Sequence, residues 1–309
     1  MTTLRQNQVT PSSNIVISKS TVIVAPGSPI DALAGNDWIA GITNEVTTTV
    51  PGGGVFGVFL EDQLSLSRGN DTLTGLATSA EGQGLVYGIV LGFNNIASSI
   101  DGGSGHDRIT GSAQTKSSGS PTQFQLGLAL FSESQILTGA GNDQIEGHAS
   151  GSARVMSGIY MTTGSSIETG SGNDRVIGTA TNSFYERTTS GIFGDSTCLL
   201  STGAGHDQVI GTATLTGDRW FGFLGGLTID LGSGNDLLKG FGAFQAFGGP
   251  GKDIYNLRGY STTDFEIAKH NQGEVLFTGL FIDFSPTATL TDFEVFIFDN
   301  GIFSYESLP

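Results

Sequence analysis

One aspartate recurs along the chain inside a short glycine-rich loop. The loop reads TGAGNDQIEG at 138–147 and TGSGNDRVIG at 169–178, and related segments lie on both sides of these two. An aspartate carboxylate is a hard oxygen ligand, and calcium takes about six to eight oxygens in flexible geometry, whereas magnesium demands a strict octahedron. The pattern therefore predicts several bound calcium ions, with eight candidate ligands, Asp37, Asp71, Asp107, Asp143, Asp174, Asp207, Asp236 and Asp253.

The spacing of these aspartates defines a repeat. Successive gaps are 34, 36, 36, 31, 33, 29 and 17 residues, a period of about 33 that shortens at the end. An apolar residue stands seven positions before and two positions after each aspartate, and a glycine stands four positions after the first seven of them. A fixed period of this length is the signature of a solenoid, in which each repeat forms one coil and stacks on the next.

The residues between the loops predict strands. Apolar and β-branched residues alternate with polar ones and are interrupted by Gly, Ser, Thr and Asn, which is typical of short strands with one buried face. Helical spacing is absent over any long window. We therefore expect an all-β fold, a right-handed parallel β-helix or β-roll solenoid with calcium-binding loops along one edge and a small C-terminal β cap.

Stacked loops would place each aspartate beside its counterparts in neighbouring coils. Such a column of like charges repels, and bound cations would remove the repulsion, so we expect calcium to be structural and to drive folding. The residue before the aspartate is Asn or His in seven loops, and both tolerate the left-handed backbone region, which we expect at this position. His106 and His206 share this column three repeats apart, which argues against a transition-metal site.

These loops resemble the RTX (repeats-in-toxin, hemolysin-type) calcium-binding nonapeptide, G-G-x-G-x-D-x-U-x, where U is a large apolar residue. The resemblance extends from about Pro29 to Leu257. It implies a parallel β-roll in which each calcium lies between turns of successive coils, held by backbone carbonyls and by the eight aspartates named above. One loop per repeat implies a single calcium edge, and Leu33 and Ser67 replace a loop glycine in the two earliest loops, whose occupancy stays open.

Composition excludes several classes of protein. The chain has 29 acidic residues against 13 Lys and Arg, a net charge of −16, which argues against nucleic acid as a partner. No apolar stretch is long enough to span a bilayer. The single cysteine, Cys198, rules out a disulfide framework, and we interpret it as a small core residue.

The ends of the chain differ from the repeats. We expect an N-terminal cap at 1–28, the calcium-binding repeats in about eight coils at 29–259, and a Phe-rich C-terminal β cap at 260–309. The cap is expected to contain the apolar segments Val275–Phe277, Phe281–Phe284 and Phe293–Phe303. The first residues lack the apolar core of a signal peptide, and the RTX resemblance implies export by a C-terminal signal. We expect an extracellular or cell-surface protein, with a cytoplasmic location as the alternative.

Two functional classes are open at this stage. The first is a calcium-binding structural or adhesive protein whose partners are calcium and a polysaccharide or cell-surface component. The second is a β-helix enzyme acting on polysaccharide or a specialised metabolite, with calcium structural. Such catalysis needs clustered carboxylates with a base, and the acids between the loops are sparse. Arg108, Gln144 and Arg175 share one column, which we interpret as a solvated outer face.

Overall fold

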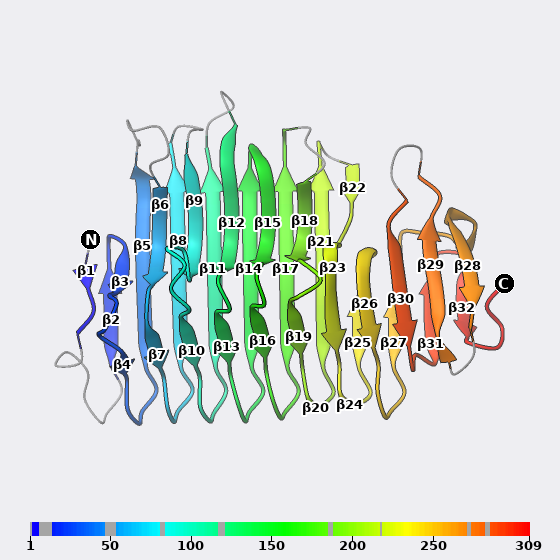
Figure 1. Cartoon of the computed structure of the whole chain (residues 1–309), viewed down its shortest axis with the longest axis horizontal. Helices are drawn as coiled ribbons and strands as arrows, with labels where there is room; N and C mark the ends of the chain where they lie inside the picture. Colours follow the sequence, from blue (N-terminus) through cyan, green and yellow to red (C-terminus); the bar gives the residue numbers. More distant parts are fainter. Residues whose placement is uncertain are drawn as a thin grey trace.

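The computed structural model of the protein is an elongated parallel β-solenoid (Figure 1). It describes residues 2–5, 14–46, 54–80, 84–116, 121–184, 188–216, 218–270, 273–281 and 285–309. Every regular element within these ranges is a strand, apart from one 3₁₀ turn, η2 (Thr262–Asp264). The all-β solenoid expected from the repeat is confirmed.

One face of the solenoid, sheet B, is made from the strand that follows each glycine-rich loop. Its register is constant, since Ile109 pairs with Leu73 on one side and with Ile145 on the other. All pairings are parallel except those of β22 with β21 and of β32 with β31. The strands are β2 (Ile15–Ser18), β5 (Trp38–Val46), β8 (Thr72–Ser79), β11 (Arg108–Thr115), β14 (Gln144–Gly151), β17 (Arg175–Asn182), β21 (Gln208–Leu215), β22 (Asp218–Trp220), β25 (Leu237–Lys239), β27 (Ile254–Asn256), β31 (Val295–Phe298) and β32 (Gly301–Ser304).

The opposite face, sheet A, receives a long and a short strand from most coils. A sharp corner separates the two, where Ser132 and Glu133 have φ of 56° and 60°. The strands before the corner are β1 (Thr2–Thr3) and β3 (Val22–Val24), which are short, and the longer β6 (Gly54–Leu60), β9 (Leu85–Leu91), β12 (Thr122–Leu130), β15 (Ala153–Met161) and β18 (Thr188–Gly194). β23 (Phe223–Asp230) extends over both sides and pairs with β26 (Gly242–Phe247). The short strands after the corner are β4 (Ile30–Asp31), β7 (Gln63–Ser65), β10 (Ser99–Asp101), β13 (Gln135–Leu137), β16 (Ser166–Glu168) and β19 (Leu199–Ser201).

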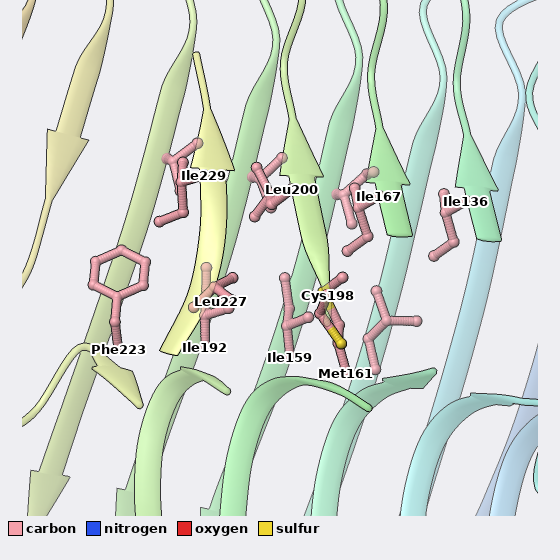
Figure 2. Packing of buried hydrophobic residues seen from close by; sticks show 14 of the residues in the cluster. Ile136, Ile159, Met161, Ile167, Ile192, Cys198, Leu200, Phe223, Leu227 and Ile229 are labelled. Carbon is pink, nitrogen blue, oxygen red and sulfur yellow. The ribbon is translucent and has the colours of Figure 1, made fainter. Parts of the chain in front are cut away.

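Apolar columns fill the space between the two sheets. Figure 2 shows Ile136, Ile167, Leu200 and Ile229 side by side from successive coils. Each such buried side chain contributes roughly 1.5–3 kcal/mol, and no coil could bury its own face alone. The two predicted inward columns are confirmed, with no member more than 2% exposed: Ile30, Leu64, Ile100, Ile136, Ile167, Leu200, Ile229 and Ala246, then Ile39, Leu73, Ile109, Ile145, Val176, Val209, Leu238 and Tyr255.

The two sheets touch through glycine. A Cβ on Gly111 would lie 2.2 Å from the carbonyl oxygen of Gly127, and one on Gly127 would lie 2.2 Å from the backbone nitrogen of His148. Real Cβ atoms essentially never come within 3.0 Å of such atoms, so these positions admit only glycine. The contact explains two recurring glycines of the repeat. Its columns are Gly41, Gly75, Gly111, Gly147, Gly178 and Gly211 on sheet B, and Gly57, Gly88, Gly127, Gly158, Gly191 and Gly222 on sheet A.

The expected Phe-rich β cap closes the C-terminal end. β28 (Phe265–Lys269), β29 (Val275–Gly279) and β30 (Thr287–Thr291) pair antiparallel, and β30 continues sheet A beside β26. Phe265, Phe277 and Phe298 are buried in it with ring centroids 5.8–6.1 Å apart. At the other end Leu4, Val22 and Val24 are buried. Residues 1 and 6–13 of the predicted N-terminal cap, and 282–284 of the segment Phe281–Phe284, lie outside the described ranges.

Candidate metal centre

The glycine-rich loops stack directly on one another along one edge of the solenoid (Figure 1). Gly141 has φ of 148°, and a Cβ there would lie 1.5 Å from the carbonyl oxygen of Gly105. Gly172 stands in the same relation to Gly141. Each loop therefore rests on the backbone of the loop before it, with no room for a side chain at this glycine. In two of these loops a pair of residues forms a short parallel strand, β20 (Ala204–Gly205) and β24 (Ser233–Gly234), and the two strands pair with each other.

The two earliest loops keep this backbone without the usual first glycine. Leu33 and Ser67 both have φ of 67°, in the same left-handed region as Gly139 at 90°. A left-handed conformation costs a residue with a side chain roughly 1–2 kcal/mol. The loops of Asp37 and Asp71 therefore have the shape of the others, at a cost in backbone strain.

The eight aspartates form one continuous buried column. The backbone N–H of Asp107 donates to Oδ1 of Asp143 at 2.8 Å, and that of Asp143 donates to Oδ1 of Asp174 at 2.8 Å. The same contact joins every consecutive pair from Asp37 to Asp253. All eight side chains are at most 2% exposed. The fold thus brings all of the sequence-predicted candidates into a single row.

Two further residues end this column, and the sequence reasoning missed both. Asn14 donates its backbone N–H to Oδ1 of Asp37 at 2.6 Å, and the backbone N–H of Asp253 donates to Oε2 of Glu294 at 2.6 Å. They occupy the aspartate position, because Ile15 pairs with Trp38 and Val295 pairs with Ile254. The available signal was an acidic or amide residue directly before an apolar strand, without the glycine loop.

The second oxygen of each carboxylate has no hydrogen-bond partner. Oδ2 of all eight loop aspartates is buried and unpaired within the described part of the chain. Leaving a buried polar atom unpaired costs about 1–3 kcal/mol, and more when it is charged. Eight such atoms in one row form a line of oxygen ligands that a cation could bind.

The pKa values of seven of these carboxyls are raised by burial. Burial raises the pKa of Asp107 to about 7, and the neighbouring Asp143 and Asp71 carboxylates raise it further against the opposing effect of the backbone hydrogen bond. Burial likewise raises the pKa of Asp71, Asp207, Asp236 and Asp253 to about 6. It also raises the pKa of Asp143 and Asp174. Without a counter-ion, ionisation of all the carboxyls in the column is therefore unfavourable.

The donor set of the loops suits calcium. Across the described residues, no three His, Cys, Asp or Glu side chains converge on one point. A bound ion would therefore take one or two carboxylate oxygens and complete its shell with backbone carbonyls, which the tight glycine turns bring close together. An all-oxygen set in flexible loops favours calcium over transition metals. The residues present fit the metal that the motif predicts.

The residue before each aspartate forms a second ladder that runs in the opposite direction. Oδ1 of Asn142 accepts the backbone N–H of Asn173 at 2.7 Å, and Nδ1 of His106 accepts that of Asn142 at 2.7 Å. The two acceptor atoms stand equally far along their side chains, so Asn and His are interchangeable here. The same contact recurs between the other loops.

This ladder corrects the left-handed backbone expected at that position. None of the described Asn or His residues directly before a loop aspartate has a positive φ. The residue type is set by the need for a hydrogen-bond acceptor, and the left-handed residues of the loop are the glycines. The ladder also accounts for His106 and His206 without a metal, in agreement with the argument against a transition-metal site.

Threonine at the first loop position adds a third ladder. The hydroxyl of Thr138 donates to the carbonyl oxygen of Thr169 at 3.2 Å, that of Thr169 to Thr202 at 3.1 Å, and that of Thr202 to Leu231 at 2.9 Å. All three threonines are fully buried. The departure from glycine at this position therefore strengthens the stacking of the loops.

Comparison with protein families identifies these loops. The family model of the RTX calcium-binding nonapeptide repeat (4 copies) matches residues 97–115 and 135–150, which contain the loops of Asp107 and Asp143. The chain contains RTX calcium-binding repeats. Comparison with curated proteins gives no significant match. RTX repeats bind calcium, and the stacked loops along one solenoid edge are the β-roll form of this family.

The remaining RTX loops share the geometry of the two matched ones. Asp71 and Asp174 lie outside the matched residues. The backbone N–H of Asp71 donates to Oδ1 of Asp107, and Oδ1 of Asp174 accepts the backbone N–H of Asp143, as in the contact between the two matched loops. Among the residues that the structure describes, no helix is long and apolar enough to cross a membrane.

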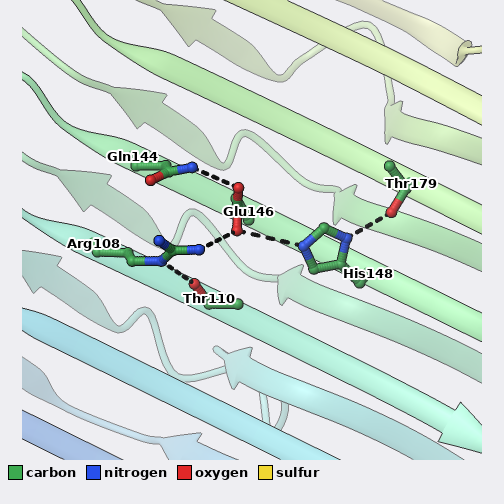
Figure 3. A network of polar contacts seen from close by, with 6 residues as sticks. All are labelled: Arg108, Thr110, Gln144, Glu146, His148 and Thr179. Atoms are coloured by element: carbon green, nitrogen blue, oxygen red, sulfur yellow. Dashed lines mark hydrogen bonds and ion pairs between the residues drawn. The ribbon is translucent and has the colours of Figure 1, made fainter.

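A separate polar cluster lies on the outer surface of sheet B, outside the RTX loops (Figure 3). Glu146 accepts a hydrogen bond from Nη2 of Arg108 at 2.8 Å and one from Nε2 of Gln144 at 2.6 Å. His148 lies between Glu146, at 3.5 Å, and the hydroxyl of Thr179, at 2.6 Å. Both carboxylate oxygens of Glu146 have partners, so it is not a free base. The cluster links β11, β14 and β17 through side-chain hydrogen bonds, and Arg108 and Gln144 stabilise the outer surface of the sheet as part of it.

Proposed function

We propose that calcium ions bind in a row along the RTX loop edge, with the eight aspartates as their acidic ligands. The observation that carries the proposal is the row of eight buried Oδ2 atoms without a hydrogen-bond partner. Calcium would supply the missing partner to each and neutralise the column. Neutralising these eight charges would change the net charge from −16 to −8.

Calcium binding and folding are coupled in this proposal. The loops contain glycines with positive φ, whose ordering costs conformational entropy, and the carboxylates repel each other once ionised. The free energy of metal binding offsets both terms only in the folded state, because the unfolded chain has no stacked loops. Calcium would therefore stabilise the folded state, as disulfides do in other proteins.

The role of the protein that we propose is extracellular. A fold that depends on several calcium ions works where free calcium is high, and extracellular calcium modules bind with dissociation constants of roughly 10⁻⁴–10⁻³ M. A solenoid of stacked coils supplies a stiff body and long flat faces, which suits a structural or adhesive protein at the cell surface. An export signal in the C-terminal cap belongs to this proposal. Leu308 is 3% exposed there, so the signal would have to be recognised before folding.

Calcium-dependent folding is tested by circular dichroism and calorimetry. The purified chain should lose strand signal in a calcium chelator and regain it when calcium, but not the same concentration of magnesium, is added in excess. Titration calorimetry of the metal-free chain should then show several calcium ions per chain. A strand signal that is unchanged after complete removal of calcium would contradict the proposal.

A further inference from the structure

A pocket of about 420 Å³ opens where the strands of sheet B become shorter. β21 runs from Gln208 to Leu215, whereas its neighbour β25 ends at Lys239, so the second half of β21 has no parallel partner on that side. β22 instead turns back and pairs antiparallel with Ala213–Leu215 (Figure 1). The step between the long and the short coils forms the floor of the pocket, and its walls include Thr212, Trp220, Lys239, Asn256, Arg258 and Tyr260.

The charge of this pocket is opposite to that of the molecule. Lys239 and Arg258 line it, and among the described side chains no carboxylate does, in a chain with 29 acidic and 13 basic residues. Lys239 and Asn256 are direct partners in the register of β25 and β27, and both line the pocket. Within the described residues, Lys239 has no ion pair or hydrogen bond through its side chain. A cation held in a recess on an acidic protein selects for an anionic group.

The aromatic walls of the pocket are held rigidly. Trp220 packs on Phe221 with ring centroids 4.9 Å apart, and Tyr260 packs against Phe265 at 5.6 Å and Phe241 at 5.9 Å. The cap therefore supports Tyr260 directly, and it supports Trp220 through Phe221, whose ring centroid lies 5.5 Å from that of Phe281. The indole N–H of Trp220 is buried and has no acceptor in the described structure. Buried donors are nearly always paired, so this unpaired N–H is unusual.

We propose that this pocket binds an acidic saccharide, with the carboxylate of a uronate residue facing Lys239 and Arg258. An arginine fork pairs well with a carboxylate, the aromatic walls offer apolar surface to a sugar ring, and Asn256 and Thr212 are suited to its hydroxyls. A volume of about 420 Å³ falls within the range of small-molecule sites. None of the eight loop aspartates lines the pocket. This inference rests on the proposed function in one respect, because it names the class of ligand for the proposed adhesive role.

Binding is measured through the fluorescence of Trp220. The chain has two tryptophans, so Trp38→Phe leaves Trp220 as the only one. Tetramers of galacturonate, glucuronate and mannuronate are titrated in a buffer that fixes free calcium at a saturating level, beside a neutral galactose tetramer, inorganic phosphate and sulfate. At least one uronate should give a saturable change, and the neutral tetramer should bind at least about tenfold more weakly.

Variants locate the binding site. Lys239→Ala and Arg258→Ala should each weaken uronate binding by about tenfold, and Lys239→Gln repeats the test with the length of the side chain kept. Lys19→Ala and Arg175→Ala remove one cation each outside the pocket and should leave binding unchanged. Equal binding of the neutral tetramer, an unchanged affinity in the pocket variants, or no binding of any uronate would overturn the proposal. Competition by phosphate or sulfate at the same concentration would reduce the pocket to an unspecific anion site. Any of these results, obtained on a chain that calcium still refolds, leaves the proposed calcium function intact.

Discussion

The backbone N–H of Asp107 donates to Oδ1 of Asp143 at 2.8 Å, while Oδ2 of the same aspartate is buried without a hydrogen-bond partner. One carboxylate therefore does two different things. One of its oxygens fixes the register between two coils, and the other is left for a cation. Because every loop repeats this arrangement, replacing the aspartate by asparagine separates the two roles.

Asp143→Asn keeps the acceptor at Oδ1 and removes the charge. In calcium we expect the free energy of unfolding to fall by about 1–3 kcal/mol, because one ligand is lost. In chelator the loss should be smaller or reversed, because one repulsive charge is removed from the column. Urea unfolding in saturating calcium measures the first value, and the strand signal that remains in chelator shows the second effect. Asp62→Asn, at a corner outside the loops, is the matched control, and an equal loss of stability in the two conditions would rule out a ligand role for Asp143.

Gly141→Ala tests the close contact between loops. A Cβ at Gly141 would meet the carbonyl oxygen of Gly105 at 1.5 Å, whereas a Cβ at Gly164, which also has positive φ, meets nothing closer than 3.5 Å. Gly141→Ala should cost about 3 kcal/mol or more and weaken calcium binding, since the loops must separate. Gly164→Ala should cost only the backbone strain of about 1–2 kcal/mol. Thermal unfolding of both variants compares them, and similar losses would show that steric contact between the loops is unimportant.

The histidine in the acceptor ladder can be exchanged in two ways. His106→Asn keeps an acceptor for the backbone N–H of Asn142, and we expect stability within about 0.5 kcal/mol of the parent. His106→Ala leaves that N–H without its partner and should cost about 1 kcal/mol. The pair is compared by urea unfolding in calcium. If asparagine destabilised as much as alanine, the hydrogen bond would not explain why Asn and His share this position.

Cys198 supplies a probe of folding that is already in the chain. It lies in the core beside Met161 and Leu200, 2% exposed, and burial raises its pKa to about 11 (Figure 2). Because the thiolate is the reactive form, we expect very slow reaction with a thiol reagent at neutral pH in calcium. Chelation should raise the rate toward that of the chain in denaturant, which serves as the upper reference. Fast labelling in saturating calcium would contradict the buried position.

The calcium-free chain should lose stability as pH rises. The folded-state pKa of Asp107 is raised from 3.8 to about 7, so the folded chain binds more protons than the unfolded chain between these values. Stability therefore falls with rising pH across this window, the reverse of the behaviour of a salt-bridged carboxylate. In calcium the trend should invert, because protons compete with the metal for the same oxygens. The strand signal that remains in metal-free buffer at the two ends of the window checks the sign, and a larger signal at the higher pH would contradict it.

The sequence was sufficient to predict which repeated residues stack in columns. The columns of Ile136 and Ile145 could be predicted, because a residue that recurs at a fixed distance from the loop aspartate must stack on its own counterpart in the next coil. For the same reason, all eight aspartates could be predicted to share one edge. The chemistry of a carboxylate between flexible glycines then indicated calcium.

What does not repeat was decided by the tertiary structure. Asn14 and Glu294 complete the aspartate column although neither lies in a glycine loop, and only the strand register places them there. Trp220 and Tyr260 line one pocket because β25 stops short of β21, an event that occurs once and leaves no period in the sequence. The function of Asn142 as an acceptor also needed coordinates, because residue type alone cannot distinguish a backbone preference from a hydrogen bond to the next coil. A period determines which residues stack, whereas contacts formed once, between segments distant in the chain, depend on the packed structure.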